Sequence, residues 1–254
     1  MSIEKTKKTE SAFTLIELLV VIAIIGILAG LLFPVISGVM IKATATRVGN
    51  NGRSIVQAII AANLERESLS MGEVWPSEGA RFKVAQQAGT KYEPKTSNEY
   101  FYDLLEAQVA EGITTFVFAG GGVRSVSSNK DLLEDGNVWD VVGNLPGAQD
   151  DTPFLISRNI NILTKLDSLA ATTFGTDSEN VMTPDDTYDL FPNPNMTPFK
   201  NIMMVFIQKG GGVQSMQRKH FINPRLFFGS ADFSSNQLKG YWQLPAKGGV
   251  NEGG

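Results

Sequence analysis

The chain of 254 residues contains no cysteine, which excludes disulfides, thiolate zinc sites, cysteine nucleophiles and a lipidated N-terminal cysteine. Its single histidine, His220, excludes a multi-histidine metal site within one chain, and we expect it to be a surface or core residue. A formal charge of −4 disfavours a broad electrostatic contact with nucleic acid. No G-x-S-x-G, Walker or H-E-x-x-H pattern occurs, and Gly120–Gly122 and Gly210–Gly212 lack the flanks of a phosphate-binding loop. The composition therefore predicts neither an enzyme nor a nucleic-acid-binding protein.

Apolar residues are concentrated near the N-terminus, where residues 18–41 run for 24 residues without a charge. A helix of that length spans roughly 36 Å, enough to cross a hydrocarbon core of about 30 Å. The segment lacks the polar face of a buried core helix, so we predict one transmembrane helix. A secretory signal peptide is the alternative, because lysines precede the run and Ala43–Ala45 supplies an A-x-A site. The run is, however, longer than the usual apolar region of about 7–15 residues.

A carboxylate, Glu17, lies between the polar leader and the apolar run. At the edge of a membrane helix an unpaired carboxylate is costly, so it implies a partner or a wet environment. If the chain is cut before Phe13, Glu17 of one copy can neutralise the new α-amino group of a neighbour and set the axial register during assembly. Glu17 also lies in the first helical turn, where the helix dipole favours an anion. Intrachain pairing, interchain pairing and solvation among the lipid headgroups all remain open.

The segment FTLIELLVVIAIIGILA, Phe13 to Ala29, follows a short charged leader and resembles the N-termini of type IV prepilins and type II secretion pseudopilins. The resemblance covers residues 1 to about 65. It implies that a prepilin peptidase cuts between Ala12 and Phe13 and N-methylates Phe13, and that Glu17 is the glutamate of the fifth mature position. Pro34 falls at the twenty-second mature position, where the family often has a proline. Ala12 departs from the usual glycine, which bears on the efficiency of cleavage.

Small residues recur at a four-residue step within the apolar run. Gly26 and Gly30 form a G-x-x-x-G pair, and Pro34 and Gly38 continue the spacing. Such spacing lets helix backbones approach closely in lipid, so we predict a packing face. The alternative is that glycine is simply common in membrane helices. Pro34 removes a backbone donor, which predicts a kink or local melting that would suit a helix packing into a bundle.

The apolar run continues into an amphipathic stretch, in which Val48, Ile55 and Leu64 help to form one apolar face. Gly49–Gly52 is a poor helix former and predicts a bend. Trp75–Pro76 is predicted to mark the exit from the long helix. These features divide the chain into a cleaved leader at 1–12, a long helix at 13–69 and a globular head at 70–254. The membrane half of the long helix is expected at about 15–41 and its amphipathic half at about 42–67.

The head is predicted to be an α+β domain, large enough for its own core. A second helix is expected with Ser97 as its cap and Gly112 at its end. Its inner face carries Tyr100, Leu104, Leu105 and Val109, and the aromatic residues Tyr100, Phe101 and Tyr102 belong to the core rather than to a ligand platform.

Short strands and one hairpin are predicted in the rest of the head. The hairpin joins Asn201–Gln208 to Val213–Phe221 through a turn rich in glycine. Pseudopilin heads carry a small antiparallel sheet against the long helix, so the resemblance implies this hairpin. The other strands are expected at Thr114–Ala119, Val138–Val142 and Pro153–Ser157.

Acidic residues gather in a proline-rich loop over residues 175–198. Oxygen-rich loops suit calcium, and some major pseudopilins bind calcium through a C-terminal loop. The spacing matches no calcium motif, so a solvated loop is the favoured interpretation, with calcium as a weak alternative and no other metal or cofactor. The residues concerned are Asp177, Glu179, Asp185, Asp186 and Asp189.

The resemblance implies a structural subunit, not an enzyme, anchored in the cytoplasmic membrane by a single span with its head in the periplasm or outside. Its partners would be the prepilin peptidase and N-methyltransferase, other pilin-like subunits, an assembly ATPase, a platform membrane protein and membrane lipid, with no nucleic acid. The absence of cysteine favours a pseudopilin, because many adhesive or DNA-uptake pilins close a C-terminal loop with a disulfide.

The alternative is a secreted or membrane-anchored binding module or enzyme, released after Ala45 or held by an uncleaved anchor. It predicts a functional cleft in the head and no dependence on Glu17. The sequence does not determine the cargo, nor whether the chain is a major subunit, a tip subunit or a true pilin.

Overall fold

The computed structural model describes residues 13–76, 94–109, 111–143, 149–161, 193, 195–218 and 243–249. Contacts divide the chain into two units, one ending at Lys42 and one beginning at Ala43. Several predicted features lie outside the described residues. They are the leader with Ala12, the acidic loop with Asp177, Glu179, Asp185, Asp186 and Asp189, the residue His220, and the far end of the hairpin at Phe221.

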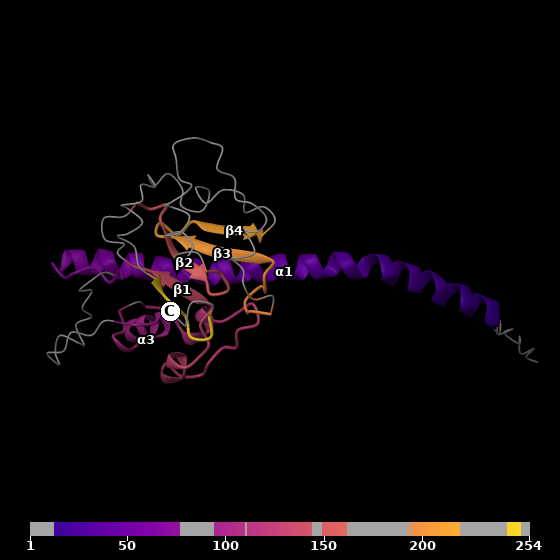
Figure 1. The fold of residues 1–254 in the computed structure, drawn as a ribbon, viewed down its shortest axis with the longest axis horizontal. Helices are drawn as coiled ribbons and strands as arrows, with labels where there is room; N and C mark the ends of the chain where they lie inside the picture. Colours follow the sequence, from indigo (N-terminus) through magenta and orange to yellow (C-terminus); the bar gives the residue numbers. More distant parts are fainter. Residues whose placement is uncertain are drawn as a thin grey trace, which may run out of the picture. The chain divides into compact units, whose positions relative to one another are not determined.

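The predicted long N-terminal helix is present as α1, which runs unbroken from Leu15 to Ser68 (Figure 1). Its backbone stays helical at Pro34. It also stays helical through Gly49–Gly52, where the sequence predicted a bend. The helix ends seven residues before Trp75, and Arg66 donates from Nε to the carbonyl of Gly72 at 2.6 Å in the turn that follows.

The head contains an antiparallel sheet in the order β4-β3-β2-β1-β5, which confirms the predicted α+β class. The strands predicted at 138–142 and 153–157 are confirmed, the first beginning one residue late. The hairpin is also confirmed, with Met203 opposite Gln217 and Ile207 opposite Val213. The strands are β1 (Trp139–Val142), β2 (Pro153–Ser157), β3 (Met203–Gln208), β4 (Val213–Gln217) and β5 (Gln243–Leu244).

The head half of α1 packs on this sheet through two glycines (Figure 1). A Cβ atom on Gly52 would lie 2.6 Å from Cγ1 of Ile207 and 2.7 Å from Cζ2 of Trp139. A Cβ atom on Gly49 would lie 2.6 Å from Cγ1 of Val213. The segment therefore stays helical because these glycines let the helix backbone touch β1, β3 and β4, and this tertiary contact outweighs low helix propensity.

The second helix, α3, runs from Ser97 to Glu106 and corrects the sequence prediction at both ends. Thr96 is the N-cap, because its Oγ1 accepts from the backbone N–H of Glu99 at 3.2 Å. Ser97 is instead buried, and its hydroxyl donates to the carbonyl of Trp139 at 2.7 Å. The helix stops well before Gly112, because Gln108 takes a left-handed conformation with φ of 49° and the backbone N–H of Val109 donates back to the carbonyl of Leu104 at 3.2 Å.

The predicted inner face of α3 is confirmed in part. Tyr100 and Leu104 are fully buried as expected, and so is Phe101, whereas Leu105 and Val109 are only half-buried. The aromatic rings of Tyr100 and Phe101 pack with centroids 5.3 Å apart. Both therefore belong to the core of the head, while Tyr102 is half-buried.

The strand predicted at 114–119 is wrong, because Thr115–Phe118 forms the 3-10 helix η1. Both ends of the segment are fixed. The Thr115 hydroxyl donates to the carbonyl of Val126 at 2.7 Å, and the ring of Phe118 packs on that of Phe101 with centroids 4.5 Å apart. Phe116 is left 65% exposed. These contacts hold the segment in a short helical turn instead of an extended strand. A second 3-10 helix, η2, spans Lys130–Leu133.

A buried cation ties the segment after β5 to the head. Arg158 donates from Nη1 to the carbonyl of Asn137 at 2.9 Å and to that of Lys247 at 2.6 Å. It also donates from Nε to the carbonyl of Thr197 at 3.2 Å. Only 5% of Arg158 is exposed. One side chain thus joins three segments that lie far apart in the sequence.

Candidate assembly segment at the N-terminus

Glu17 closes a capping box at the start of α1. The backbone N–H of Thr14 donates to Oε2 of Glu17 at 2.8 Å, and the Thr14 hydroxyl donates to the same oxygen at 2.7 Å. The backbone N–H of Glu17 is 3.3 Å from Oγ1 of Thr14. The motif T-x-x-E is the sequence signature of such a box, which satisfies N–H groups that the first turn leaves without partners.

The part that Thr14 takes was not predicted, although the T-x-x-E spacing signals it. Within one chain the carboxylate of Glu17 already has a partner, and it lies in the first turn, where the helix dipole favours an anion. Pairing of Glu17 with the α-amino group of a cut Phe13, within one chain or between copies, stays a prediction. Oε1 of Glu17 has no hydrogen-bond partner among the described residues, and we expect it to be open to a group from another chain.

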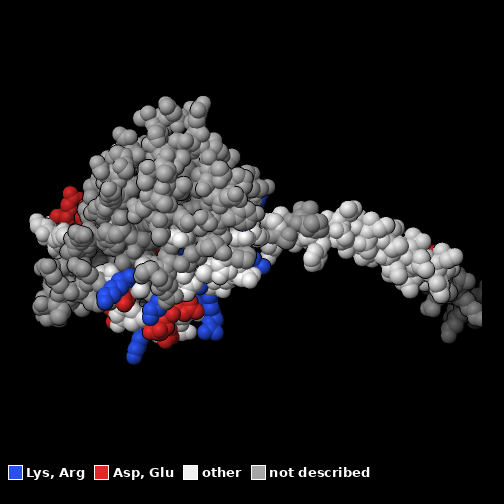
Figure 2. Space-filling view, viewed as in Figure 1, with Lys and Arg blue, Asp and Glu red and all other residues white. Residues whose placement is uncertain are grey.

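The N-terminal part of α1 presents an apolar surface on all sides. Residues Leu15–Phe33 form a helical stretch of 19 residues that is long and apolar enough to cross a membrane, and none of this stretch is buried in the chain. In Figure 2 it is drawn white along most of its length, and Glu17 is the one charged residue that it contains. Even Leu31 and Phe33 are 69% and 80% exposed. An apolar surface of this size marks a membrane or protein contact.

The glycines of the apolar run have open space around them. A Cβ atom on Gly26, Gly30 or Gly38 would meet nothing within 4 Å, whereas Gly49 and Gly52 are pressed against the sheet. The first three therefore serve no packing contact within the chain. The predicted packing face formed by these glycines and Pro34 would therefore contact helices of other chains, and it stays a prediction.

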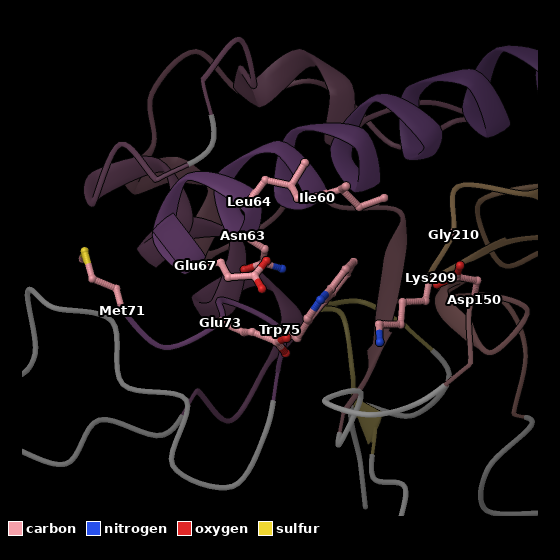
Figure 3. A pocket seen from close by; sticks show the side chains of 10 residues that line it. All are labelled: Ile60, Asn63, Leu64, Glu67, Met71, Glu73, Trp75, Asp150, Lys209 and Gly210. Carbon is pink, nitrogen blue, oxygen red and sulfur yellow. The ribbon is translucent and has the colours of Figure 1, made fainter. Parts of the chain in front are cut away.

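The head carries one further feature of note, a pocket of about 450 Å³ (Figure 3). Its wall comes from the end of α1, from the segment that follows it, and from two loops at the edge of the sheet. In the part of the head that the structure describes, no group of three or more His, Cys, Asp or Glu side chains is placed to hold a metal ion. The lining residues are Ile60, Asn63, Leu64, Glu67, Met71, Glu73, Trp75, Asp150, Lys209 and Gly210.

Residues 7–33 match the family described as the prokaryotic N-terminal methylation motif. This is the prepilin-type cleavage and methylation motif of type IV pilin-like proteins, so the resemblance inferred from Phe13–Ala29 is confirmed. The motif implies processing by a prepilin peptidase and assembly with other pilin-like subunits. Together with the apolar helix it fits a single-pass, membrane-anchored protein. Comparison with curated proteins and with solved structures gives no match.

Proposed function

We propose that this chain is a structural subunit of a pilus-like filament, of the type II secretion pseudopilus or type IV pilus kind, that serves protein secretion. A prepilin peptidase cuts between Ala12 and Phe13 and methylates the new amino group. The chain is held in the inner membrane by α1, with its head in the periplasm or outside. An assembly ATPase and a platform membrane protein then build the filament from it and other subunits.

The observation that carries this proposal is the capped start of an exposed apolar helix within the matched motif. Thr14 keeps its peptide N–H after cleavage before Phe13, so the capping box survives processing. Glu17 then offers Oε1 to the cationic amino group of Phe13 in a neighbouring copy. In lipid, where an unpaired charge is costly, such a pair selects one axial register.

The apolar helix and its glycines support assembly in a second way. Gly26 and Gly30 have no contact to their own chain that a Cβ would disturb, so two such helices can approach closely there. Pro34 cannot donate a backbone hydrogen bond and weakens the helix at one point, which lets it adjust to its neighbours in the filament.

The test is the N-terminus of the membrane-associated protein, determined by mass spectrometry with and without the prepilin peptidase. We expect a mature chain that begins at Phe13 and carries one N-methyl group, and only in the presence of the peptidase. Cells that lack the peptidase are the matched control, because the same chain should then keep its leader. A chain that begins at Met1 in both strains would overturn the proposal.

The second candidate is a head released by signal peptidase after Ala45, which would give a chain that begins at Thr46. Ala45 lies within unbroken α1 and is only 3% exposed, because it packs in the core of the head. Cleavage there would remove part of that packing. The structure thus favours the filament subunit, and the same mass spectrum distinguishes the two.

A further inference from the structure

The pocket at the end of α1 has an excess of negative charge. Glu67, Glu73 and Asp150 line it, and Lys209 is the one cation among its described lining residues. Among the residues that the structure describes, none of the three carboxylates has an ion-pair partner. The C-terminus of α1 adds the negative end of the helix dipole. An anionic ligand would be repelled from this wall, and a cationic group would be attracted.

An aromatic ring in the same pocket already holds a cation. Nζ of Lys209 lies 5.7 Å from the centroid of the Trp75 ring, within the range of a cation–π interaction. Figure 3 shows Trp75 between the two glutamates on one side and Lys209 with Asp150 on the other. The edge of the ring is fixed by Phe154, whose centroid is 5.1 Å away.

The pocket is also held in shape by hydrogen bonds. Oδ1 of Asn63 accepts from the backbone N–H of Val74 at 2.8 Å, and the carbonyl of Val74 accepts from the hydroxyl of Tyr100 at 3.1 Å. On the opposite wall the backbone N–H of Gly210 donates to the carbonyl of Asp150 at 2.8 Å. Nδ2 of Asn63 is buried and has no acceptor among the described residues. A preformed site of this kind binds at a lower entropic cost.

The rim of the pocket suits a long basic side chain. Leu64 is 64% exposed and Met71 is half-buried, so the aliphatic stem of an arginine can lie against them. Its guanidinium would then meet the carboxylates of Glu67 and Glu73. Arginine is the cation that interfaces favour, because its planar head both stacks on rings and binds carboxylates in pairs.

The exposed Arg53 on α1 offers its charge to a group outside the chain. Arg53 forms no hydrogen bond or ion pair with any residue that the structure describes, and it is exposed. Arg47 is likewise exposed and without a hydrogen bond or ion pair to a described residue, but it lies beside Gly120 of its own head. Arg53 precedes Glu67 by 14 residues on the same helix, about 21 Å along its axis, so the two cannot pair within one chain.

We propose that the pocket formed by Glu67, Glu73 and Trp75 binds Arg53 of a second copy of this chain. The inference rests on the proposed function, because a filament repeats α1 along one direction and brings the basic part of one helix toward the acidic end of another. The contact is head-to-tail, joining different surfaces of the two copies, and such an interface propagates into an open filament when the rotation between copies does not close a ring.

The first test reverses charges in the full-length processed protein and measures polymer that sediments after shearing. Arg53→Glu alone and Glu67→Arg alone should each lower the yield of polymer about fivefold or more, as for a lost charge pair. The combination should restore most of it, because the pair is re-formed with the charges exchanged. Lys130→Glu, an equal charge change at another exposed site of the head, should leave the yield unchanged. Failure of the combination to restore assembly overturns the proposal.

The second test uses the absence of native cysteine. Arg53→Cys and Glu67→Cys are introduced together and treated with a short bis-maleimide, because an arginine–glutamate pair holds its Cα atoms farther apart than a disulfide allows. Covalent dimers and longer ladders are expected. Ser54→Cys with Glu67→Cys is the matched control and should give few covalent dimers or ladders. No ladder, despite normal polymer and a mature Phe13 terminus, overturns this contact but leaves the proposed function intact. Absence of polymer from the processed wild-type chain overturns the proposed function itself.

Discussion

Thr14 donates both its backbone N–H and its hydroxyl to the same oxygen of Glu17, at 2.8 and 2.7 Å. This relationship stabilises the first turn of α1, and it fixes the orientation of the only carboxylate in the apolar segment. One side chain can therefore cap its own helix and present a negative charge to a neighbour. The two roles are separable by mutation.

Replacing Glu17 by alanine should leave membrane insertion intact and reduce filament assembly by roughly tenfold or more, because an α-amino cation is left without its partner in a medium of low polarity. Glu17→Gln keeps an oxygen that accepts from Thr14 but has no charge. We expect it to assemble as poorly as the alanine variant. Polymer yield and membrane fractionation measure the two effects, and normal assembly of Glu17→Gln would show that the cap alone matters.

Alanine at Gly52 should destabilise the head, because its Cβ would meet Ile207 and Trp139 at 2.6 and 2.7 Å. Overpacking of this kind costs about 1–3 kcal/mol in free energy of unfolding, more than alanine gains in helix propensity. Thermal unfolding of the full chain in detergent measures the loss. Gly72→Ala is the control, since a Cβ there meets nothing within 4 Å, and it should change the stability by less than about 0.5 kcal/mol. An unchanged melting temperature for Gly52→Ala would contradict the close approach of α1 to the sheet.

Alanine at Arg158 should be among the most disruptive changes in the head. It removes the donors to Asn137, Thr197 and Lys247 and leaves their carbonyls without partners. Breaking a buried charged network costs about 3–5 kcal/mol, so protease resistance of the head should be largely lost.

The control for Arg158 is Lys247→Ala, which keeps the Lys247 carbonyl and removes only an exposed ion pair with Glu134 at 3.3 Å. Its effect on the free energy of unfolding should stay below about 1 kcal/mol. Equal effects of the two variants would show that Arg158 acts merely as a surface charge. Arg158→Lys should not rescue the head, because lysine cannot reach all the carbonyls from one planar group.

Asp103 makes the stability of the head depend on pH. Burial, and secondarily the charge of Glu99, raises the pKa of its carboxyl from 3.8 to about 6. Its Oδ2 is buried without a hydrogen-bond partner among the described residues. Since the folded pKa is raised, the folded state binds the proton more tightly, and this group lowers stability as pH rises from about 4 to about 6.

Asp103→Asn should therefore be more stable than the wild type at pH 7, by up to about 1 kcal/mol after allowance for solvent screening. The difference should shrink toward zero near pH 4. Urea unfolding of both proteins between pH 4 and pH 8 measures this difference in the free energy of unfolding. The Glu99→Gln variant should show a weaker dependence of stability on pH than the wild type, because the charge of Glu99 contributes to the raised pKa of Asp103. A difference that stays constant across this range would contradict the assignment to Asp103.

Local pattern alone predicted much of the molecule. The motif from Phe13 to Ala29, the long helix, and the hairpin with its glycine turn depend on interactions between residues close in the chain or between one segment and its solvent. The same holds for the T-x-x-E box, whose residues lie within one turn of the helix. Propensity, capping and the partition of apolar side chains are properties that a short segment carries with it.

Tertiary structure decided the rest. Gly49–Gly52 is a helix breaker by propensity, yet it stays helical because the sheet packs against it. Thr114–Ala119 was predicted as a short strand, yet contacts with Val126 and Phe101 hold it in a 3-10 helix. The pocket joins Glu67, Trp75, Asp150 and Lys209. Which of these distant residues meet depends on how the whole core packs, and the free energy of that packing is a property of no single segment.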